Sequence, residues 1–286
     1  MKSLLHAIAF ASLLTFTAAA AAPGTGASFQ GPVGLQLYSL RGIATQNPPK
    51  ALQQTKDFGL TLVETAGTYN LPPEKFKALL AEHGLKPISG HFPYDRWKTE
   101  PEKVIAEAKA IGLQYAGCAW INHKAPFSEA AVRDAAAVFN KAGELAAKQG
   151  IKVFYHAHGF EFHPHGDGTL MDLLMKETNP QHVSFQMDVL WVVFPGQDPV
   201  KWLKKYPGRW ELMHLKDLKK GVKTGDLSGK TDVSNDVALG TGQMNWPAIL
   251  KAAQETGVKY YFIEDESPTV VEQIPQTLKF LESVKF

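Results

Sequence analysis

Residues 130–156 read AAVRDAAAVFNKAGELAAKQGIKVFYH, an alanine-rich stretch, a glycine and then a short apolar run. Apolar side chains recur every three or four residues in the first part, which predicts a helix over residues 130–149 with one buried face. The positions that share this face are Val132, Ala136, Phe139, Leu145 and Ala146. Gly150 stands where helices commonly end on glycine, and residues 151–156 have the length of a buried strand. The stretch therefore reads as one helix followed by one strand.

The same unit recurs along the chain. Short apolar runs begin 26 to 50 residues apart, and the stretches between them have helical spacing. The eight runs are 33–38, 60–64, 86–91, 115–120, 151–156, 183–188, 210–214 and 260–264. Helices that alternate with eight strands predict a closed barrel. An open doubly wound sheet is the rival fold, but residues 37–41, directly after the first run, lack the glycine-rich phosphate turn of that fold.

We therefore predict an α/β fold, a (β/α)8 TIM barrel formed by a single domain over residues 32–286. One long excursion, residues 219–243, is polar and glycine-rich, and we expect it to lie over the C-terminal mouth of the barrel. The chain carries 30 Lys and Arg residues against 28 Asp and Glu, and this net charge of +2 calls for no nucleic-acid partner. Its single cysteine, Cys118, excludes an intramolecular disulfide and a metal cluster held by thiolates alone.

Residues 1–22 have the composition of a targeting segment. They combine Lys2, an apolar run and an alanine-rich end. This pattern predicts a signal peptide over residues 1–22, followed by a linker over residues 23–31. A membrane anchor is the alternative, but the strongly apolar part is short for a span of about 20 residues. We expect an exported protein, periplasmic or secreted, without stable membrane insertion after cleavage, and its oligomeric state stays open.

Polar side chains gather at the C-terminal ends of the predicted strands, where the active sites of such barrels lie. In chain order they are Gln36, Tyr38, Glu64, His91, His156, His158, Glu161, Asp188, His214, Lys216 and Glu264. Any one of them alone is more often a turn cap or a hydrogen-bonded core residue than a ligand. Imidazoles and carboxylates from four strands together favour a binding site, because burying several unpaired charges in one place is costly. A divalent cation bound between them would offset this cost. Mixed nitrogen and oxygen ligands suit zinc, manganese, cobalt or iron.

At these segments the chain resembles the xylose isomerase-like TIM barrels, the sugar isomerase/epimerase superfamily, over roughly residues 31–286. The segments that carry the resemblance are GLQLYS (34–39), YHAHGFEF (155–162), FQMDVLW (185–191), MHLKD (213–217), GTG (240–242) and IEDE (263–266). Each segment alone is unspecific, and the set together is specific. The resemblance implies the same barrel that the strand and helix pattern predicts.

The resemblance also implies one divalent metal ion, bound by residues of strands five to eight. Asp188, His214 and Glu264 stand at three of the four ligand positions, and His156 stands where the family usually has glutamate. His158 and Glu161 lie close enough in sequence to take the place of His156. The change to histidine departs from the family's two-glutamate proton shuttle. The ion stays open among manganese, zinc, cobalt, iron and magnesium.

The chemistry that the resemblance implies is proton removal next to a carbonyl of a small carbohydrate, in isomerisation, epimerisation or elimination. Keto-sugars, 3-keto-glycosides among them, suit an exported member. The catalytic residues implied are Glu264 as base, one of His156, His158 or Glu161 facing it, and Lys216 as the holder of negative charge. Substrate contacts are expected from Gln36, Tyr38, Glu64, His91, His158 and Trp191.

Two other functions stay open at this point. A catalytically silent sugar-binding barrel would keep aromatic residues at the mouth and lose its acid and base groups. A metal-dependent hydrolase of the endonuclease type needs further His and Glu ligands and a basic groove, which a near-neutral chain does not supply. For Lys216 the structural alternative is an ion pair with Asp217 or Glu211 at the rim of the barrel.

Overall fold

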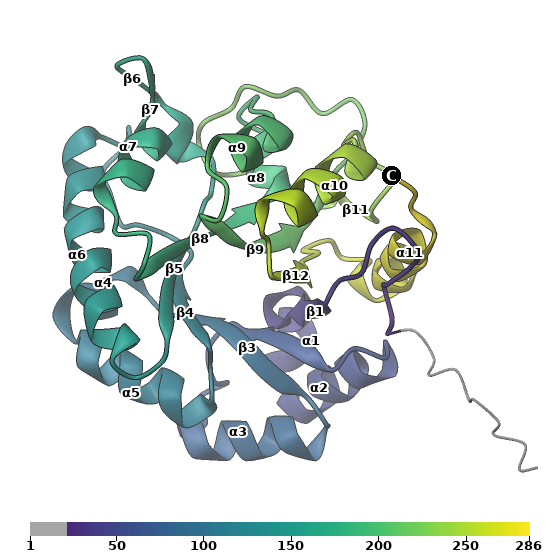
Figure 1. Ribbon diagram of the computed structural model, residues 1–286. Coiled ribbons are helices and arrows are strands. Elements are labelled where there is room, and N and C mark those ends of the chain that lie inside the picture. Colours follow the sequence, from purple (N-terminus) through teal and green to yellow (C-terminus); the bar gives the residue numbers. More distant parts are fainter. Residues whose placement is uncertain (1–21) are drawn as a thin grey trace, which may run out of the picture.

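The barrel predicted from the sequence is confirmed. The computed structural model describes residues 22–286, and within them eight parallel strands close into a ring with helices around it (Figure 1). In their order around the ring the strands are β1 (Val33–Gln36), β2 (Leu62–Thr65), β3 (Lys86–His91), β4 (Tyr115–Cys118), β5 (Lys152–His156), β8 (Val183–Asp188), β9 (Trp210–Leu215) and β12 (Tyr260–Ile263).

Helices connect successive strands and cover the outside of the ring (Figure 1). They are α1 (Arg41–Ala44), α2 (Pro48–Asp57), α3 (Pro73–Glu82), α4 (Tyr94–Thr99), α5 (Pro101–Ile111), α6 (Glu129–Ala147), α7 (Leu170–Glu177), α8 (Val189–Val193), α9 (Pro199–Lys205), α10 (Trp246–Thr256) and α11 (Val270–Ser283). The 3-10 turns are η1 (Leu37–Leu40), η2 (Phe160–Phe162) and η3 (Val233–Asn235), and a small hairpin joins β6 (Pro164–His165) to β7 (Gly168–Thr169).

Helix α6 forms where the sequence predicts it. It begins after Ser128, whose hydroxyl accepts the backbone N–H of Ala131 at 3.3 Å and so caps the helix. Of the face predicted to be buried, Val132, Ala136, Phe139 and Ala146 lie in the core, and Leu145 packs against it half-buried. Gly150 follows with a φ of +72°, a backbone conformation that glycine adopts without strain.

Several strand bounds differ from the sequence expectation by one or two residues, and two departures lie near the start of the described chain. The first strand ends at Gln36 instead of residue 38, because the Gln36 side chain accepts the N–H of Tyr38 at 3.0 Å and turns the chain into η1. Residues 23–31 pack against the barrel instead of forming a free linker. Phe29 is fully buried, with its ring 4.9 Å from that of Tyr261.

The predicted signal peptide lies almost wholly outside the described residues and stays a prediction. Among residues 22–286, each helix is too short or too polar to cross a bilayer.

The excursion over residues 219–243 lies at the mouth of the barrel, as predicted. It is framed by a two-stranded hairpin of β10 (Asp217–Leu218) and β11 (Asp236–Val237). The Asp217 carboxylate accepts the amides of Gly240 and Gly242, at 3.0 and 3.1 Å, which ties down the C-terminal end of the excursion. At its middle, Gly229 packs so closely that a Cβ there would lie 3.0 Å from the Phe160 ring.

The inside of the barrel is filled in layers. An apolar layer consists of Ile88, Tyr115, Phe154, Leu212 and Phe262. Successive strand residues alternate between the lumen and the helices, so the residue two positions further along a strand points into the next lumen layer. His156, His214 and Glu264 follow Phe154, Leu212 and Phe262 by this spacing. The apolar layer therefore supports a layer of titratable groups at the C-terminal ends of the strands.

Gly117 on β4 offers a test of how closely this apolar layer is packed, because it lies against the Phe154 ring. A Cβ at this position would lie 2.5 Å from the Phe154 ring, so we expect Gly117→Ala to lower the free energy of unfolding by about 1–3 kcal/mol. The control is Gly42→Ala in α1, where the new methyl group meets open space and alanine favours the helix. Urea denaturation of both variants checks this, and equal unfolding midpoints would contradict the close packing.

Candidate metal centre and active-site cavity

His214 lies at the centre of the layer of titratable groups and contacts three carboxylates. Its Nε2 lies 2.5 Å from Glu64 Oε1, and its Nδ1 lies 3.1 Å from Glu264 Oε2 and 3.7 Å from Asp188 Oδ2. Side chains from β2, β8 and the end of β12 thus meet on one imidazole of β9. Burial opposes protonation of this ring, but the charges of Glu264 and Glu64 outweigh it and hold the pKa of His214 well above its ordinary value.

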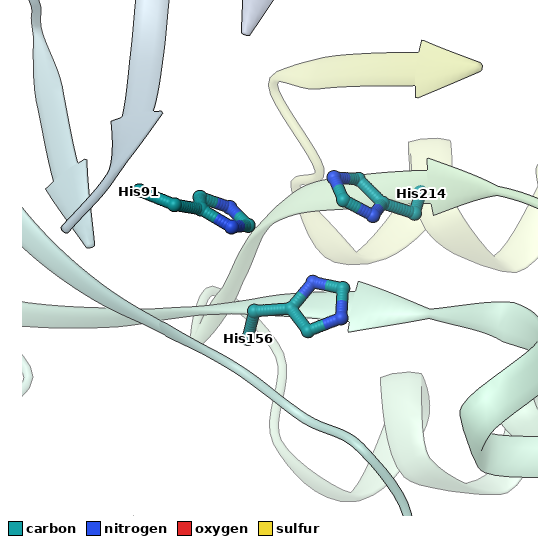
Figure 2. A group of neighbouring side chains, drawn as sticks. All are labelled: His91, His156 and His214. Carbon is teal, nitrogen blue, oxygen red and sulfur yellow. The ribbon is translucent and has the colours of Figure 1, made fainter. Parts of the chain in front are cut away.

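His156 presents one ring nitrogen to the same point. Its Nδ1–H donates to Gln186 Oε1 at 2.9 Å, which leaves Nε2 as the lone-pair nitrogen, 3.9 Å from Asp188 Oδ2. Figure 2 shows the His156 ring on β5 and the His214 ring on β9 close together, with the His91 ring facing them from β3. Strand β8 lies between β5 and β9 in the barrel. Burial, helped by the charge on His214, lowers the pKa of His156 well below its ordinary value. The ring is therefore neutral, as a metal ligand must be.

His91 belongs to a hydrogen-bonded layer around these two rings. His91 Nε2 lies 3.0 Å from Gln186 Oε1 and 3.1 Å from Glu64 Oε1, and Gln186 Nε2 donates to Glu64 Oε2 at 2.7 Å. Gln36 and Ser89 also donate to the Glu64 carboxylate, each at 2.6 Å. This layer fixes which nitrogen of His156 and of His214 faces Asp188.

The donor set fits a divalent cation. Asp188 is completely buried, and its Oδ2 has no hydrogen-bond partner among the described residues. Ligand atoms of Asp188, His214 and Glu264 all lie within 4.8 Å of one another. A buried carboxylate oxygen without a partner is costly, and a cation between these atoms and His156 Nε2 removes that cost. Two imidazoles with two carboxylates are an ordinary ligand set for zinc and for other first-row metals.

A cavity of about 860 Å³ opens above this centre. Of the residues predicted to contact substrate, Gln36, Tyr38, His91, His158 and Trp191 line it, as do the predicted catalytic residues His156, Lys216 and Glu264. Tyr38 is 44% exposed, with the Arg41 guanidinium 4.5 Å above its ring. The walls toward the β3 and β4 loops are mostly apolar, from Phe92, Pro93, Tyr94, Ala119 and Trp120. The cavity has the size and mixed lining of a small-molecule site.

Lys216 is buried in the cavity wall and surrounded by carboxylates. Its Nζ donates to Glu266 Oε1 at 2.6 Å and to Glu264 Oε2 at 3.2 Å, and it lies 3.6 Å from Asp236 Oδ2. The structural alternative, an ion pair of Lys216 with Asp217 or Glu211, does not form. The Asp217 carboxylate binds backbone amides of the excursion, and Glu211 pairs with Lys152 and Lys259.

Two of the residues predicted to contact substrate or to act in catalysis do not line the cavity. Glu64 lies beneath it, fully buried within the hydrogen-bonded layer, so its contacts are with His214 and His91. Glu161 is also fully buried. Its carboxylate accepts the Tyr155 hydroxyl and the amides of His158 and Gly159, at 3.1 and 2.7 Å for the amides. The structure therefore turns Glu161 away from Asp188 and leaves His156 as the residue of β5 that faces it.

Sequence reasoning missed three residues of the site. In the sequence, only the position of Gln186 on the same strand face as Asp188 points to the site. In the structure its side chain orients both His156 and His91. Asp236 lies in β11 at the mouth, where the polar composition carries no strand signal that would bring it to Lys216. Trp120 lies two residues beyond the end of β4 and lines the cavity, and its position at the C-terminal end of an apolar strand is the signal that the sequence offers.

The chain is similar in sequence and in fold to proteins of known family. The profile of the xylose isomerase-like TIM barrels matches residues 52–284. An inosose dehydratase of Clostridium tetani is 37% identical over 100 residues, which is 34% of this chain and only 32% of that relative's length. A sugar phosphate isomerase/epimerase of Parabacteroides distasonis is 26% identical, with a TM-score of 0.74 over 94% of this chain and 98% of that one. The IolI protein, crystallised with zinc, shares the fold at 14% identity, with a TM-score of 0.66 over 87% of this chain and 95% of its own.

The layer beneath the metal centre is testable through Glu64. Glu64→Gln keeps an acceptor for His214 Nε2–H but removes the charge that strengthens this hydrogen bond, so zinc affinity should fall about 10- to 100-fold. The control is Glu161→Gln, which removes an equally buried carboxylate away from the cavity and should leave the affinity within about threefold. Competition titration against a chelator measures both, and equal losses would contradict the role of Glu64.

Proposed function

The chain belongs to the xylose isomerase-like TIM barrel family, and from this premise we propose that it is a metal-dependent enzyme of carbohydrate metabolism. The proposed reaction is isomerisation, epimerisation or elimination, begun by removal of a proton next to a carbonyl. One observation carries the proposal. The unpartnered Asp188 oxygen lies among His156, His214 and Glu264, directly beneath a cavity lined by acid and base groups.

His156, Asp188, His214 and Glu264 would hold the cation. Bound there, a divalent ion supplies Lewis-acid polarisation of a carbonyl or hydroxyl oxygen. Glu264 is the proposed base, because it lines the cavity and Lys216 and His214 hold its pKa well below the ordinary value against the effect of burial. The lowered pKa keeps Glu264 ionised at neutral pH, and only the ionised carboxylate can accept a proton.

Lys216 is the proposed holder of the negative charge that develops on the substrate oxygen. Burial opposes its charge, but the surrounding carboxylates, Glu264 first, hold its pKa well above the ordinary value. A fixed cation in a cavity of low dielectric constant stabilises a developing oxyanion without any rearrangement of solvent. Trp191, whose ring centroid lies 5.8 Å from Lys216 Nζ, offers a flat apolar face beside the reacting group.

The proposed substrate class is a sugar or keto-sugar, because the relatives include an inosose dehydratase and a sugar phosphate isomerase/epimerase. The matched part of the inosose dehydratase is only about a third of that protein, so its activity supports the class and not the compound. Export to the periplasm or medium remains our expectation from residues 1–22. Of the alternatives, a silent sugar-binding barrel fits poorly, because it has no use for buried groups as costly as Lys216 and Glu264.

Metal content tests the centre. Purified protein loaded with zinc or manganese should hold about one equivalent of metal, and His214→Ala should lose most of it. Asp188→Ala/His214→Ala, which removes two of the proposed ligands, should lose it entirely. Inductively coupled plasma mass spectrometry after dialysis gives the stoichiometry. A full equivalent retained by the double variant would place the metal elsewhere.

The chemistry is testable through proton exchange. Metal-loaded protein incubated in D2O with a panel of keto-sugars should place deuterium on the carbon next to the carbonyl, as read by NMR. Glu264→Gln should abolish exchange and turnover, since loss of a positioned base costs about 10²–10⁴ in rate. Lys216→Ala should lower kcat by about 10²–10³ with the metal retained. The control is Lys259→Ala, which removes a lysine that pairs with Glu211, and it should change neither kcat nor the metal content. Turnover without exchange, and without an isotope effect from an α-deuterated substrate, would refute proton abstraction.

A further inference from the structure

The mouth of the barrel brings a carboxyl group into the cavity that the metal centre does not use. Asp236 belongs to β11, which pairs with β10 so that Asp236 lies opposite Leu218. Its side chain lines the cavity and the residue is only 3% exposed. Because β10 continues the chain directly beyond β9, the hairpin holds Asp236 beside Lys216 on the cavity wall.

Asp236 and Glu264 share one lysine. Asp236 Oδ2 accepts the backbone N–H of Glu266 at 2.9 Å and lies 3.6 Å from Lys216 Nζ, while Glu264 Oε2 lies 3.2 Å from the same Nζ. The two carboxyl groups are therefore held close to each other by a single ammonium group, and both line the same cavity. Two neighbouring carboxyl groups that face one substrate commonly divide the roles of acid and base.

The surroundings of Asp236 favour its protonated form. Burial raises its pKa to about 7, although Lys216 and the Glu266 amide oppose the rise, and the negative charges of Glu266 and Asp188 add to it. The Glu266 carboxylate is itself engaged by Lys216 and, at 3.4 Å, by Arg41. Asp236 therefore keeps its proton to a higher pH than an ordinary aspartate, and a group with a pKa near 7 both donates and regains a proton readily.

We propose that Asp236 is the proton donor to the oxygen that leaves when the reaction begun at Glu264 proceeds as an elimination. The inference rests on the proposed function and narrows its substrate class to keto-sugars with a leaving oxygen β to the carbonyl, such as 3-keto-glycosides. Glu264 takes the proton from C2, and the electron pair of that bond moves onto the C3 carbonyl oxygen, whose negative charge Lys216 stabilises. When the carbonyl forms again, the electron pair makes the C1=C2 double bond and the C1–O bond breaks. The leaving oxygen takes the proton of Asp236, and an alcohol departs. Glu264 then releases its proton to water and Asp236 regains one from water, so both groups return to their starting states.

The test compares two leaving groups on methyl and 4-nitrophenyl 3-keto-glucopyranosides, each as both anomers, with the metal-loaded protein. Methoxide needs a proton to leave and 4-nitrophenolate does not. Asp236→Asn keeps an acceptor for the Glu266 amide and should lower methanol release about 10²–10⁴-fold, while C2 exchange in D2O and nitrophenolate release change less than tenfold. A purely structural role would slow both leaving groups equally. The control is Asp226→Asn, an exposed carboxylate of the excursion, which should match the wild type.

The pH dependence gives a second readout. A proton donor works only while protonated, so methanol release by the wild type should fall as the pH rises through about 7, and Asp236→Asn should lack this limb. In ¹³C NMR of carboxyl-labelled protein, a resonance missing from Asp236→Asn should titrate near pH 7. A titration near the ordinary value of about 4 would overturn the assignment.

The outcomes separate the two proposals. Wild-type protein that exchanges no proton next to a carbonyl, in these glycosides or in the wider keto-sugar panel, contradicts the proposed function itself. Wild-type protein that exchanges protons of the panel but releases no alcohol from any of these glycosides overturns the narrowed substrate class. Wild-type protein that exchanges the C2 proton and releases alcohol, together with Asp236→Asn that releases methanol as fast as Asp226→Asn, overturns only the role of Asp236.

Discussion

The buried His214 imidazole, with a carboxylate on each of its nitrogens, is the interaction on which the rest of the site depends. Glu64 on Nε2 fixes the ring from the β2 side, and Glu264 and Asp188 face Nδ1 from the other. In a lumen of low dielectric constant these charges are tolerable only while they compensate one another. Asp188 Oδ2 is the atom to which the described residues donate no hydrogen bond. A divalent cation at that point replaces the second proton of His214 and completes the balance, and metal binding should accordingly release a proton.

The barrel supplies this arrangement through its layers. The apolar layer around Phe154 closes the lumen from below, and the hydrogen-bonded layer of Glu64, Gln186 and His91 lies around the two ligand histidines. The ligands come next, and Lys216 and Asp236 lie on the cavity wall above them. Each layer orients the one that follows it. Substrate therefore meets groups whose positions are set before it binds, which is the condition for electrostatic stabilisation of a transition state.

Much of this was predictable from the sequence, because barrels are built from regular repeats. The helical spacing of residues 130–149, followed by Gly150 and a short apolar run, predicts one helix and one strand. The structure contains both with nearly the predicted bounds, as α6 and β5. Strand alternation places His156, His214 and Glu264 in the lumen with no knowledge of contacts. The choice among His156, His158 and Glu161 was not accessible. It depends on the Tyr155 hydroxyl and two backbone amides that bind Glu161, and their geometry exists only in the folded turn.

The other features that the sequence did not predict depend on contacts between segments far apart in the chain. The strand register shifts between Val63 and Glu64 and again between Phe185 and Gln186, and such irregularities re-aim side chains in a way that depends on the neighbouring strand. Asp236 is likewise placed by a hairpin whose two short strands are separated by a long stretch of loop composition. Residues 23–31 have the composition of a linker, yet one aromatic ring, Phe29, finds a partner in Tyr261.

The central claim is the position of the metal, and anomalous diffraction from crystals soaked in manganese or zinc tests it most directly. The account predicts a single strong peak bound by His156 Nε2, Asp188, His214 Nδ1 and Glu264, at about 2.0–2.2 Å from each ligand atom. A peak among His91, His156 Nδ1 and His214 Nε2 instead, or crystals that bind the ion only at the surface, would contradict it.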